Sequence, residues 1–174
     1  MIYLRDVTLD FMEVVKKRRS IRKYKTTRVS KKDLEYVLEA ARLAPSWGNR
    51  QCWKYVVVTS GALKKKITMK DWAAEAPVVI VACADPAKSG DKDGKPYYML
   101  DIGISMEHLM LAAADKGLGT CWLGGQFDEK VVKEVLGIPE NIRVVALTPL
   151  GYPDEVPLAK DRKSLDEAVS RNKW

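Results

Sequence analysis

A dense run of positive charge near the N-terminus is the first feature of this sequence that could do chemistry. Residues 16–25 contain no acidic side chain. The basic residues of this run are Lys16, Lys17, Arg18, Arg19, Arg22, Lys23 and Lys25. Their seven positive charges equal the formal net charge of the whole chain, +7. Such a field suits the phosphates of a nucleic acid, a single small anion, or a solvated face of long side chains, and the charge alone leaves all three open.

The other reactive residue types are few. The three cysteines, Cys52, Cys83 and Cys121, form no C-x-x-C pair, and His108 is the single histidine. A zinc site or a disulfide framework is therefore not expected, and no metal is predicted. His108 lies in an apolar run and is expected to pack within a helix. Cys83 and Cys121 are expected to be buried and inert, whereas Cys52 is the thiol to test for reactivity.

The glycines do not form a nucleotide-binding loop. Neither G-x-G-x-x-G nor G-x-x-x-x-G-K-[ST] occurs, which disfavours a dinucleotide or triphosphate held by a glycine-rich turn. Gly117 and Gly119 are expected to end a helix, and Gly124 and Gly125 to form a tight turn.

The elements that must position these residues alternate between helical and extended patterns. Helices are predicted over 8–19 (capped by Asp10), 30–44 (capped by Ser30 and stopped by Pro45), 62–69, 97–116, 128–136 and 164–169. Strands are predicted over 53–59, 78–84, 120–123 and 143–150. An extended backbone after Ser20 would point Arg18, Ser20 and Arg22 to one side and Ile21 into the core. Residues 45–53 and 85–96 are expected to be loops.

The segment 97–116 has almost no polar face, so this helix must be covered on most sides. In a chain of 174 residues, part of that cover could come from a second subunit.

Length and composition indicate one globular domain over 1–174, with 47% hydrophobic residues. No apolar stretch reaches 18 residues, and the N-terminus carries Arg5 and Asp6 where a signal peptide needs an apolar run. The protein is expected to be soluble and cytoplasmic, without membrane contact.

Four ordered segments together resemble the nitroreductase family of flavin enzymes. They are RRSIR at 18–22, PSWGNRQCW at 45–53, DIGISMEHLMLAAADKGLGTCWLGG at 101–125, and the closing LGYPDEVP with KDR. The resemblance spans nearly the whole chain. Cys52 stands where the family usually has proline, and the chain lacks the longer insertions of larger members.

The resemblance implies an α+β fold: a three-layer α/β/α arrangement with a central mixed, mostly antiparallel sheet flanked by helices. It further implies an entwined homodimer with one non-covalent FMN per subunit at the interface. In this interpretation the basic run binds a small anion, the FMN phosphate, and no nucleic acid.

The resemblance also implies roles for individual residues. Arg18, Lys160 and Arg162 would hold the phosphate, Ser20 would bond the phosphate or the ribityl chain, and Arg22 would face the N1/O2 edge of the ring. Arg19 belongs to the same motif, although its side chain is expected to be solvated or at an interface. The remaining candidates are Pro45, Ser46 and Asn49 (from the partner subunit), Gln51, and the glycine turn Leu123, Gly124 and Gly125.

The implied function is an FMN-dependent NAD(P)H oxidoreductase that works by a ping-pong cycle. NADH or NADPH would pass hydride to flavin N5, and a nitroaromatic, a quinone or a similar electrophile would then take the electrons. No catalytic side chain is predicted, because the flavin carries the chemistry and Arg22 tunes it. The alternatives are another flavin reaction (reductive dehalogenation or oxidative flavin breakdown), a basic nucleic-acid-binding module, and a flavin carrier or sensor without turnover.

Overall fold

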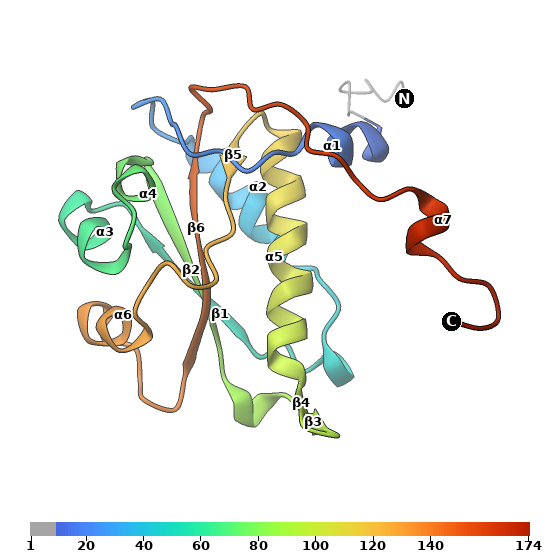
Figure 1. The fold of residues 1–174 in the computed structure, drawn as a ribbon. Helices are drawn as coiled ribbons and strands as arrows, with labels where there is room; N and C mark the ends of the chain where they lie inside the picture. The colour runs from blue at the N-terminus through green and yellow to red at the C-terminus, as the bar shows by residue number, and fades with distance from the viewer. Residues whose placement is uncertain (1–9) are drawn as a thin grey trace, which may run out of the picture.

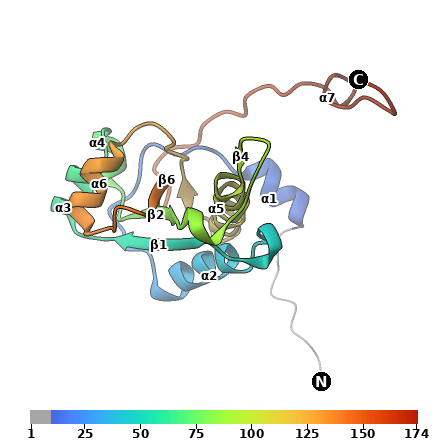
Figure 2. The same cartoon turned by 90° about the horizontal axis from the view of Figure 1, so that it is seen from below.

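A four-stranded antiparallel sheet forms the centre of the molecule, with helices on both faces (Figures 1 and 2). The computed structural model describes residues 10–174. The strands are β1 (Trp53–Val58), β2 (Val78–Ala84), β6 (Arg143–Gly151) and β5 (Gly119–Thr120), in that order across the sheet. One parallel bridge, Ser20 to Thr120, adds the N-terminal segment to the edge. The α+β arrangement predicted from the sequence is confirmed.

The helices divide into two layers. The helices are α1 (Phe11–Lys17), α2 (Lys31–Arg42), α3 (Gly61–Ile67), α4 (Asp71–Glu75), α5 (Tyr97–Asp115), α6 (Glu129–Leu136) and α7 (Leu165–Ala168). Figure 1 shows α3, α4 and α6 on one side of the sheet and α2 and α5 on the other. Short 3-10 turns cover Trp47–Asn49 and Pro86–Lys88, and a small hairpin joins β3 (Asp91–Lys92) to β4 (Lys95–Pro96).

The strand β2 shows why this sheet is buried on both faces. Its run VVIVACA is fully buried, as its unbroken apolar pattern predicts. Ile80 and Ala82 pack with α2 and α5, whereas Val79 and Val81 pack with α3, α4 and α6. Successive side chains of one strand thus supply both halves of the core.

Most predicted elements are present, and their ends follow the predicted caps. The Asp10 side chain accepts from Met12 N–H, Ser30 from Asp33 N–H, and Asp128 from Lys130 and Val131 N–H. Ser164 and Glu167 form a reciprocal capping box at α7. These side chains satisfy N–H groups that have no partner within the first helical turn.

Three predictions need correction. The first helix ends at Lys17 instead of residue 19, because Arg18 is already extended and leads into the bridge at Ser20; residues 8 and 9 lie outside the described residues. The predicted strand 120–123 is reduced to β5 and an isolated bridge between Leu123 and Leu147. The short helix α4 was not predicted, since five residues are too few for a helical period to show.

Gly119 has a different role from the predicted one. Gly117 does end α5, with φ of +68°. Gly119, however, lies in β5, and a Cβ there would stand 2.6 Å from Ile21 Cγ1. The absent side chain lets the N-terminal segment pack onto the sheet edge.

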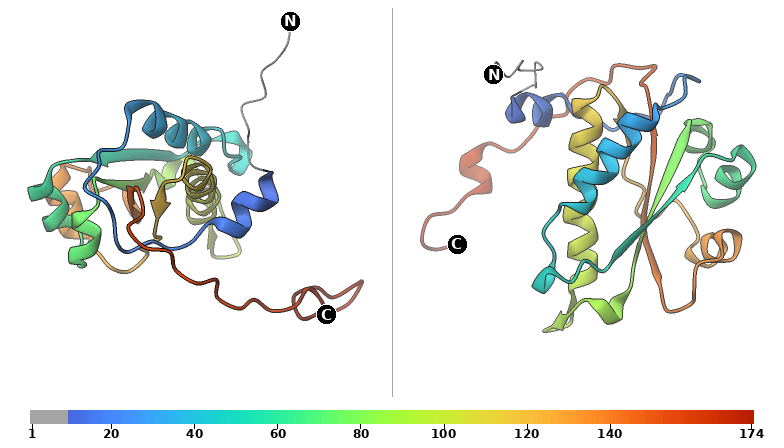
Figure 3. Two further views of the ribbon diagram at one scale, coloured as in Figure 1. Left: turned by 90° about the horizontal axis from the view of Figure 1, so that it is seen from above. Right: turned by 180° about the vertical axis from the view of Figure 1, so that it is seen from behind.

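The C-terminal segment leaves the body of the molecule. From about residue 156 the chain runs outward, and α7 stands apart from the two layers (Figure 3). The side chains of Val156 and Leu158 are 96% and 91% exposed. Within residues 10–174, no helix combines the length and the apolar character needed to cross a membrane.

Candidate cofactor site

The basic run and the C-terminal segment together form a hollow of about 480 Å³. Its walls come from the end of α1, the extended residues that follow it, and residues 157–162. Five of the predicted site residues line it: Arg18, Arg19, Ser20, Lys160 and Arg162. The fold therefore brings together cations that are about 140 positions apart in the sequence.

A second hollow of about 450 Å³ adjoins the first and shares Lys16, Arg18, Arg19 and Pro157 with it. Its far wall is the C-terminal end of α5, at Ala114 and Gly117. Glu155 is the acidic residue among its lining side chains. Lys16 is thus placed beside the predicted phosphate ligands, although its sequence position suggested only a solvated charge.

The parallel bridge connects this basic hollow to the glycine turn. Ile21 N–H donates to Thr120 carbonyl oxygen at 2.9 Å, and the Ile21 side chain is buried as predicted. Cys121 follows directly. Burial raises the pKa of the Cys121 thiol, while the charges of Arg22 and Arg18 and the Ser20 hydroxyl act in the opposite direction. Arg18 and Ser20 line the first hollow together, whereas Arg22 lines neither hollow, so the predicted grouping of all three side chains holds only for the first two.

Arg22 is set apart from the hollow by its own contacts. Its guanidinium carbon lies 5.9 Å from the centre of the Trp72 ring on α4. Its backbone N–H and that of Lys23 both donate to Glu155 Oε1, the second at 3.1 Å. The Glu155 carboxylate is thus used by the backbone, and the Arg22 guanidinium stays exposed.

In the glycine turn, both main-chain groups of Leu123 are already hydrogen-bonded, so only those of Gly124 and Gly125 are candidates for binding a ligand. Leu123 N–H donates to Leu147 carbonyl oxygen at 2.9 Å, and Leu147 N–H returns the bond at 3.0 Å. The Leu123 side chain is buried. A Cβ on Gly124 would meet Trp122 Nε1 at 2.8 Å, whereas nothing lies within 4 Å of one on Gly125.

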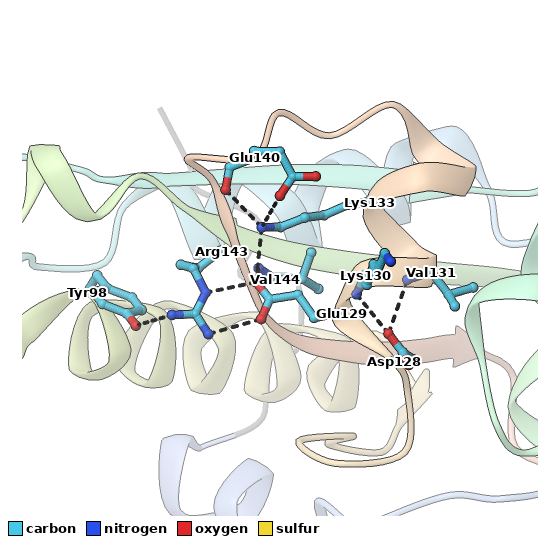
Figure 4. A network of polar contacts seen from close by, with 9 residues as sticks. All are labelled: Tyr98, Asp128, Glu129, Lys130, Val131, Lys133, Glu140, Arg143 and Val144. Carbon is cyan, nitrogen blue, oxygen red and sulfur yellow. Dashed lines mark hydrogen bonds and ion pairs between the residues drawn. The ribbon is translucent and has the colours of Figure 1, made fainter.

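The cations of the hollow have no carboxylate partner in the described part of the chain; Arg19 instead donates to the Lys16 and Arg18 carbonyl oxygens. Figure 4 shows a contrasting case, in which Arg143 holds Glu129 through two hydrogen bonds of 2.9 and 3.0 Å. Lys133 lies 3.6 Å from Glu129 and 3.8 Å from Glu140. Across residues 10–174, no carboxylate forms an ion pair with Arg18, Arg19, Lys160 or Arg162. This donor set of guanidinium, ammonium and hydroxyl groups suits a phosphate monoester such as that of FMN.

The remaining predicted residues lie at the opposite end of α5. Pro45, Ser46, Asn49 and Gln51 belong to the loop that packs near Tyr97, where α5 begins, while the basic hollow adjoins its last turn. A helix of 19 residues spans about 28 Å. One chain does not bring the two groups together.

Asp101 is a site residue that sequence reasoning missed. Its carboxylate is buried in α5 and accepts hydrogen bonds from Trp47 N–H, Ser89 and Cys52. The available signal was a single acid within the apolar segment MLDIGISM of this helix.

The cysteines show no sign of reactivity. All three are buried, Cys52 included, and burial raises the pKa of Cys52 and of Cys83 to about 11. Cys52, the thiol that the sequence singled out for a reactivity test, is buried like the other two and lies beside Asp101. In the described part of the chain, no three His, Cys, Asp or Glu residues are grouped as metal ligands.

Comparison with known proteins agrees with this geometry. The family model described as Nitroreductase family matches residues 15–71 and 68–152. The chain belongs to the nitroreductase family. A protein of Archaeoglobus fulgidus that carries the name NADH dehydrogenase/NAD(P)H nitroreductase is 39% identical, over 94% of this chain and 98% of its own. This nitroreductase-family chain is an oxidoreductase.

Solved structures place the fold in the same family. A nitroreductase family protein from Clostridium novyi NT has a TM-score of 0.80 and 43% identity, over 95% of both chains. An FMN-dependent nitroreductase from Clostridium difficile R20291 has a TM-score of 0.83 and 30% identity, over 94% of this chain and 99% of that one. The nitroreductase-like fold predicted from the sequence is confirmed.

Proposed function

We propose that this protein is an FMN-dependent oxidoreductase that takes hydride from NADH or NADPH and reduces a small conjugated electrophile, such as a nitroaromatic or a quinone. The observation that carries the proposal is the basic hollow, where Arg18, Arg19, Lys160 and Arg162 surround Ser20. One phosphate monoester has nearly two negative charges and three acceptor oxygens, and it can therefore accept hydrogen bonds from several cationic side chains at once. A nucleic acid would instead need cations spread along a groove.

The chain's own residues would bind and orient FMN. Arg18, Lys160 and Arg162 would hold the phosphate, and the Ser20 hydroxyl, beside Cys121, would donate to the phosphate or the ribityl chain. Gly124 and Gly125 would let the main chain approach the ring, because no side chain stands in the way. Arg22 would place its positive charge at the edge of the ring where negative charge gathers on reduction.

Bound FMN supplies the centre that accepts hydride from the nicotinamide and later releases electrons to the acceptor. Trp72 flanks the Arg22 guanidinium at 5.9 Å, and Trp122 lies against Gly124, so two indoles border the proposed ring position. Such flat apolar walls favour planar conjugated acceptors.

The working unit in this proposal is a homodimer. The outer face of α5 leaves Met99, Leu100 and Ile104 exposed, and Phe11 and Leu43 are exposed beside it. Contiguous apolar side chains of this kind indicate a surface that another chain covers. A second copy with α5 antiparallel to the first would bring its loop 45–51 next to the basic hollow. The C-terminal segment, with its exposed Val156 and Leu158, would then lie on the partner subunit.

The decisive test is the visible spectrum of the purified protein after incubation with FMN and gel filtration. A retained flavin spectrum, bleached by NADH or NADPH without oxygen, is the expected result. A colourless protein, or bound flavin that neither nucleotide bleaches, would contradict the proposal, and the second outcome would indicate a carrier or sensor.

Steady-state kinetics then test the reaction type. We expect NAD(P)H oxidation that depends on a quinone or nitroaromatic, with parallel reciprocal plots. Negligible turnover would instead favour reductive dehalogenation or oxidative flavin breakdown. Size measurement by light scattering should give twice the mass of 19.6 kDa.

A further inference from the structure

Asp101 binds three separate segments through one carboxylate. It belongs to α5, its side chain is 2% exposed, and it accepts from Trp47 N–H at 2.8 Å. Ser89 Oγ donates at 3.0 Å and the Cys52 thiol at 3.4 Å, both to the second oxygen. A buried carboxylate is costly unless donors of this kind surround it. Two of the three donors, Trp47 and Cys52, are the two ends of one loop.

The loop between these two ends has an unusual backbone. Gly48, Asn49 and Gln51 have φ values of 56°, 54° and 49°. Left-handed backbone is uncommon for residues other than glycine and persists where the surrounding structure imposes it. Ser46 Oγ accepts from Gln51 N–H at 2.9 Å, which closes the loop on itself. Asn49 and Gln51, the two predicted cofactor contacts, thus owe their exposed positions to this folded loop.

The Trp47 side chain anchors the same loop. Its ring stacks on the Tyr97 ring, with 5.9 Å between the two ring centres. The Arg50 guanidinium carbon lies 4.4 Å from the centre of the Trp47 ring. A Cβ on Gly90 would stand 2.7 Å from the ring, so the indole packs directly on that main chain. Trp47 is therefore engaged within its own subunit. Gln51 Nε2 donates to the Asn49 carbonyl oxygen at 3.2 Å and to Asn49 Oδ1 at 3.4 Å, so the two exposed amides are held together on the outer side of the loop.

We infer that Asp101 is a positioning residue for the cofactor: it fixes both ends of the loop so that Asn49 and Gln51 face the FMN held by the partner subunit. This inference rests on the proposed function. Asp101 itself is buried and cannot touch the cofactor, so its effect must pass through Asn49 or Gln51.

Asparagine at position 101 tests this, since it keeps the shape of the side chain but replaces one acceptor oxygen with a donor. Asp101→Asn keeps one acceptor oxygen for Trp47 N–H, but its amide N–H groups face Ser89 and Cys52, so the bonds from those two residues must reverse or be lost. Ser89→Ala is the matched control, because it removes a bond to the same carboxylate and leaves both ends of the loop bound. Asn49→Gly removes the proposed contact, and glycine tolerates the left-handed backbone there. The double variant Asp101→Asn/Asn49→Gly completes the cycle.

The readout is the FMN dissociation constant of each homodimer, measured by quenching of flavin fluorescence, together with the absorption maximum of the bound flavin. We expect a rise of about tenfold for Asp101→Asn and for Asn49→Gly, and again about tenfold for the double variant instead of about a hundredfold. Ser89→Ala should change the constant by less than about twofold. Asp101→Asn should shift the flavin maximum in the same direction as Asn49→Gly.

Several results would overturn the inference. Additive effects in the double variant would mean that Asp101 does not act through Asn49. Equal weakening by Ser89→Ala and Asp101→Asn would mean a general structural role. If Asn49→Gly and a matching Gln51→Gly variant both leave binding unchanged, the loop does not contact the cofactor. A wild-type protein that binds no FMN would instead refute the proposed function itself, and the inference with it.

Discussion

Two cation-rich regions of this molecule use the same residue types in opposite ways. Between α6 and β6, Lys133 and Arg143 surround Glu129, which also accepts from Val144 N–H at 2.9 Å. In the basic hollow, Arg18, Arg19, Lys160 and Arg162 gather with no carboxylate partner among the residues that the structure describes. The first region stabilises the fold, because each charge is neutralised within it. The second is where we propose that an external anion binds, because several of its unpaired cations line one hollow.

The largest expected effect comes from removing one cation of the hollow. Arg18→Ala should raise the FMN dissociation constant by about 10- to 100-fold, because a charge-assisted hydrogen bond to phosphate is lost. Lys17→Ala is the control: Lys17 lines the second hollow but not the first, and its ammonium lies 3.8 Å from the Glu13 carboxylate. Flavin fluorescence titration measures both. Equal affinities of the two variants would mean that the phosphate assignment is wrong.

The paired region should respond in the opposite way. Arg143→Ala should lower the free energy of unfolding by about 1 kcal/mol, since half of the Arg143 side chain is exposed and the pair is partly screened. The FMN dissociation constant should not change. Urea unfolding provides the measurement, and Arg42→Ala, which breaks an exposed pair with Glu39 within α2, should cost less. A large loss of flavin affinity in Arg143→Ala would remove the distinction between the two regions.

Salt should separate the regions further, by a smaller amount. Raising the ionic strength from about 0.05 M to about 0.5 M should weaken FMN binding by about threefold, because exposed cations attract the phosphate through solvent. The free energy of unfolding should change little over the same range, since only 10% of the Lys133 side chain and 28% of the Glu129 side chain are exposed. Flavin affinity that does not respond to salt would contradict an electrostatic hold on the phosphate.

The smallest expected effect is on the pH dependence of stability. Hydrogen bonds from Arg143 lower the pKa of Glu129 below its ordinary value of 4.5. Its ionised form therefore stabilises the folded state above that value, and this stabilisation is lost as the pH falls through the lowered pKa. Glu129→Gln should be less stable than wild type near pH 7, and the difference should vanish near about pH 2. A constant difference across this range would show that Glu129 does not act through its charge.

The sequence predicted the core because it depends on patterns that are local in the chain. The apolar run of β2 and the capping residues Ser30 and Asp128 each occur within a few neighbouring positions. The motif at 18–22 and the pair Lys160 and Arg162 were joined only through the family resemblance, and the fold places them around one hollow.

The contacts that the sequence did not reveal depend on residues far apart in the chain. Asp101 accepts hydrogen bonds from Trp47, Cys52 and Ser89. The sequence separations between these residues do not follow a helical or strand repeat, so no local pattern indicates the contacts. Gly119 looked like the end of a helix, and only the position of Ile21 above it explains why a side chain is absent. The loop 45–51 and the hollow are separated by the length of α5, which was predicted to within one residue. No single motif in the sequence indicates that separation.

The parallel bridge between Ser20 and Thr120 joins positions roughly 100 residues apart, so the chain must pay a large loop-closure entropy before this edge exists. A nascent or unfolded chain contains the same arginines but does not form the hollow, so it does not bind the anion there. Any anion that occupies the hollow is therefore a ligand of the closed chain alone, and at about a hundred times its dissociation constant it adds about 2.7 kcal/mol to the free energy of unfolding. An abundant ligand of this hollow would therefore also slow the proteolysis of the protein.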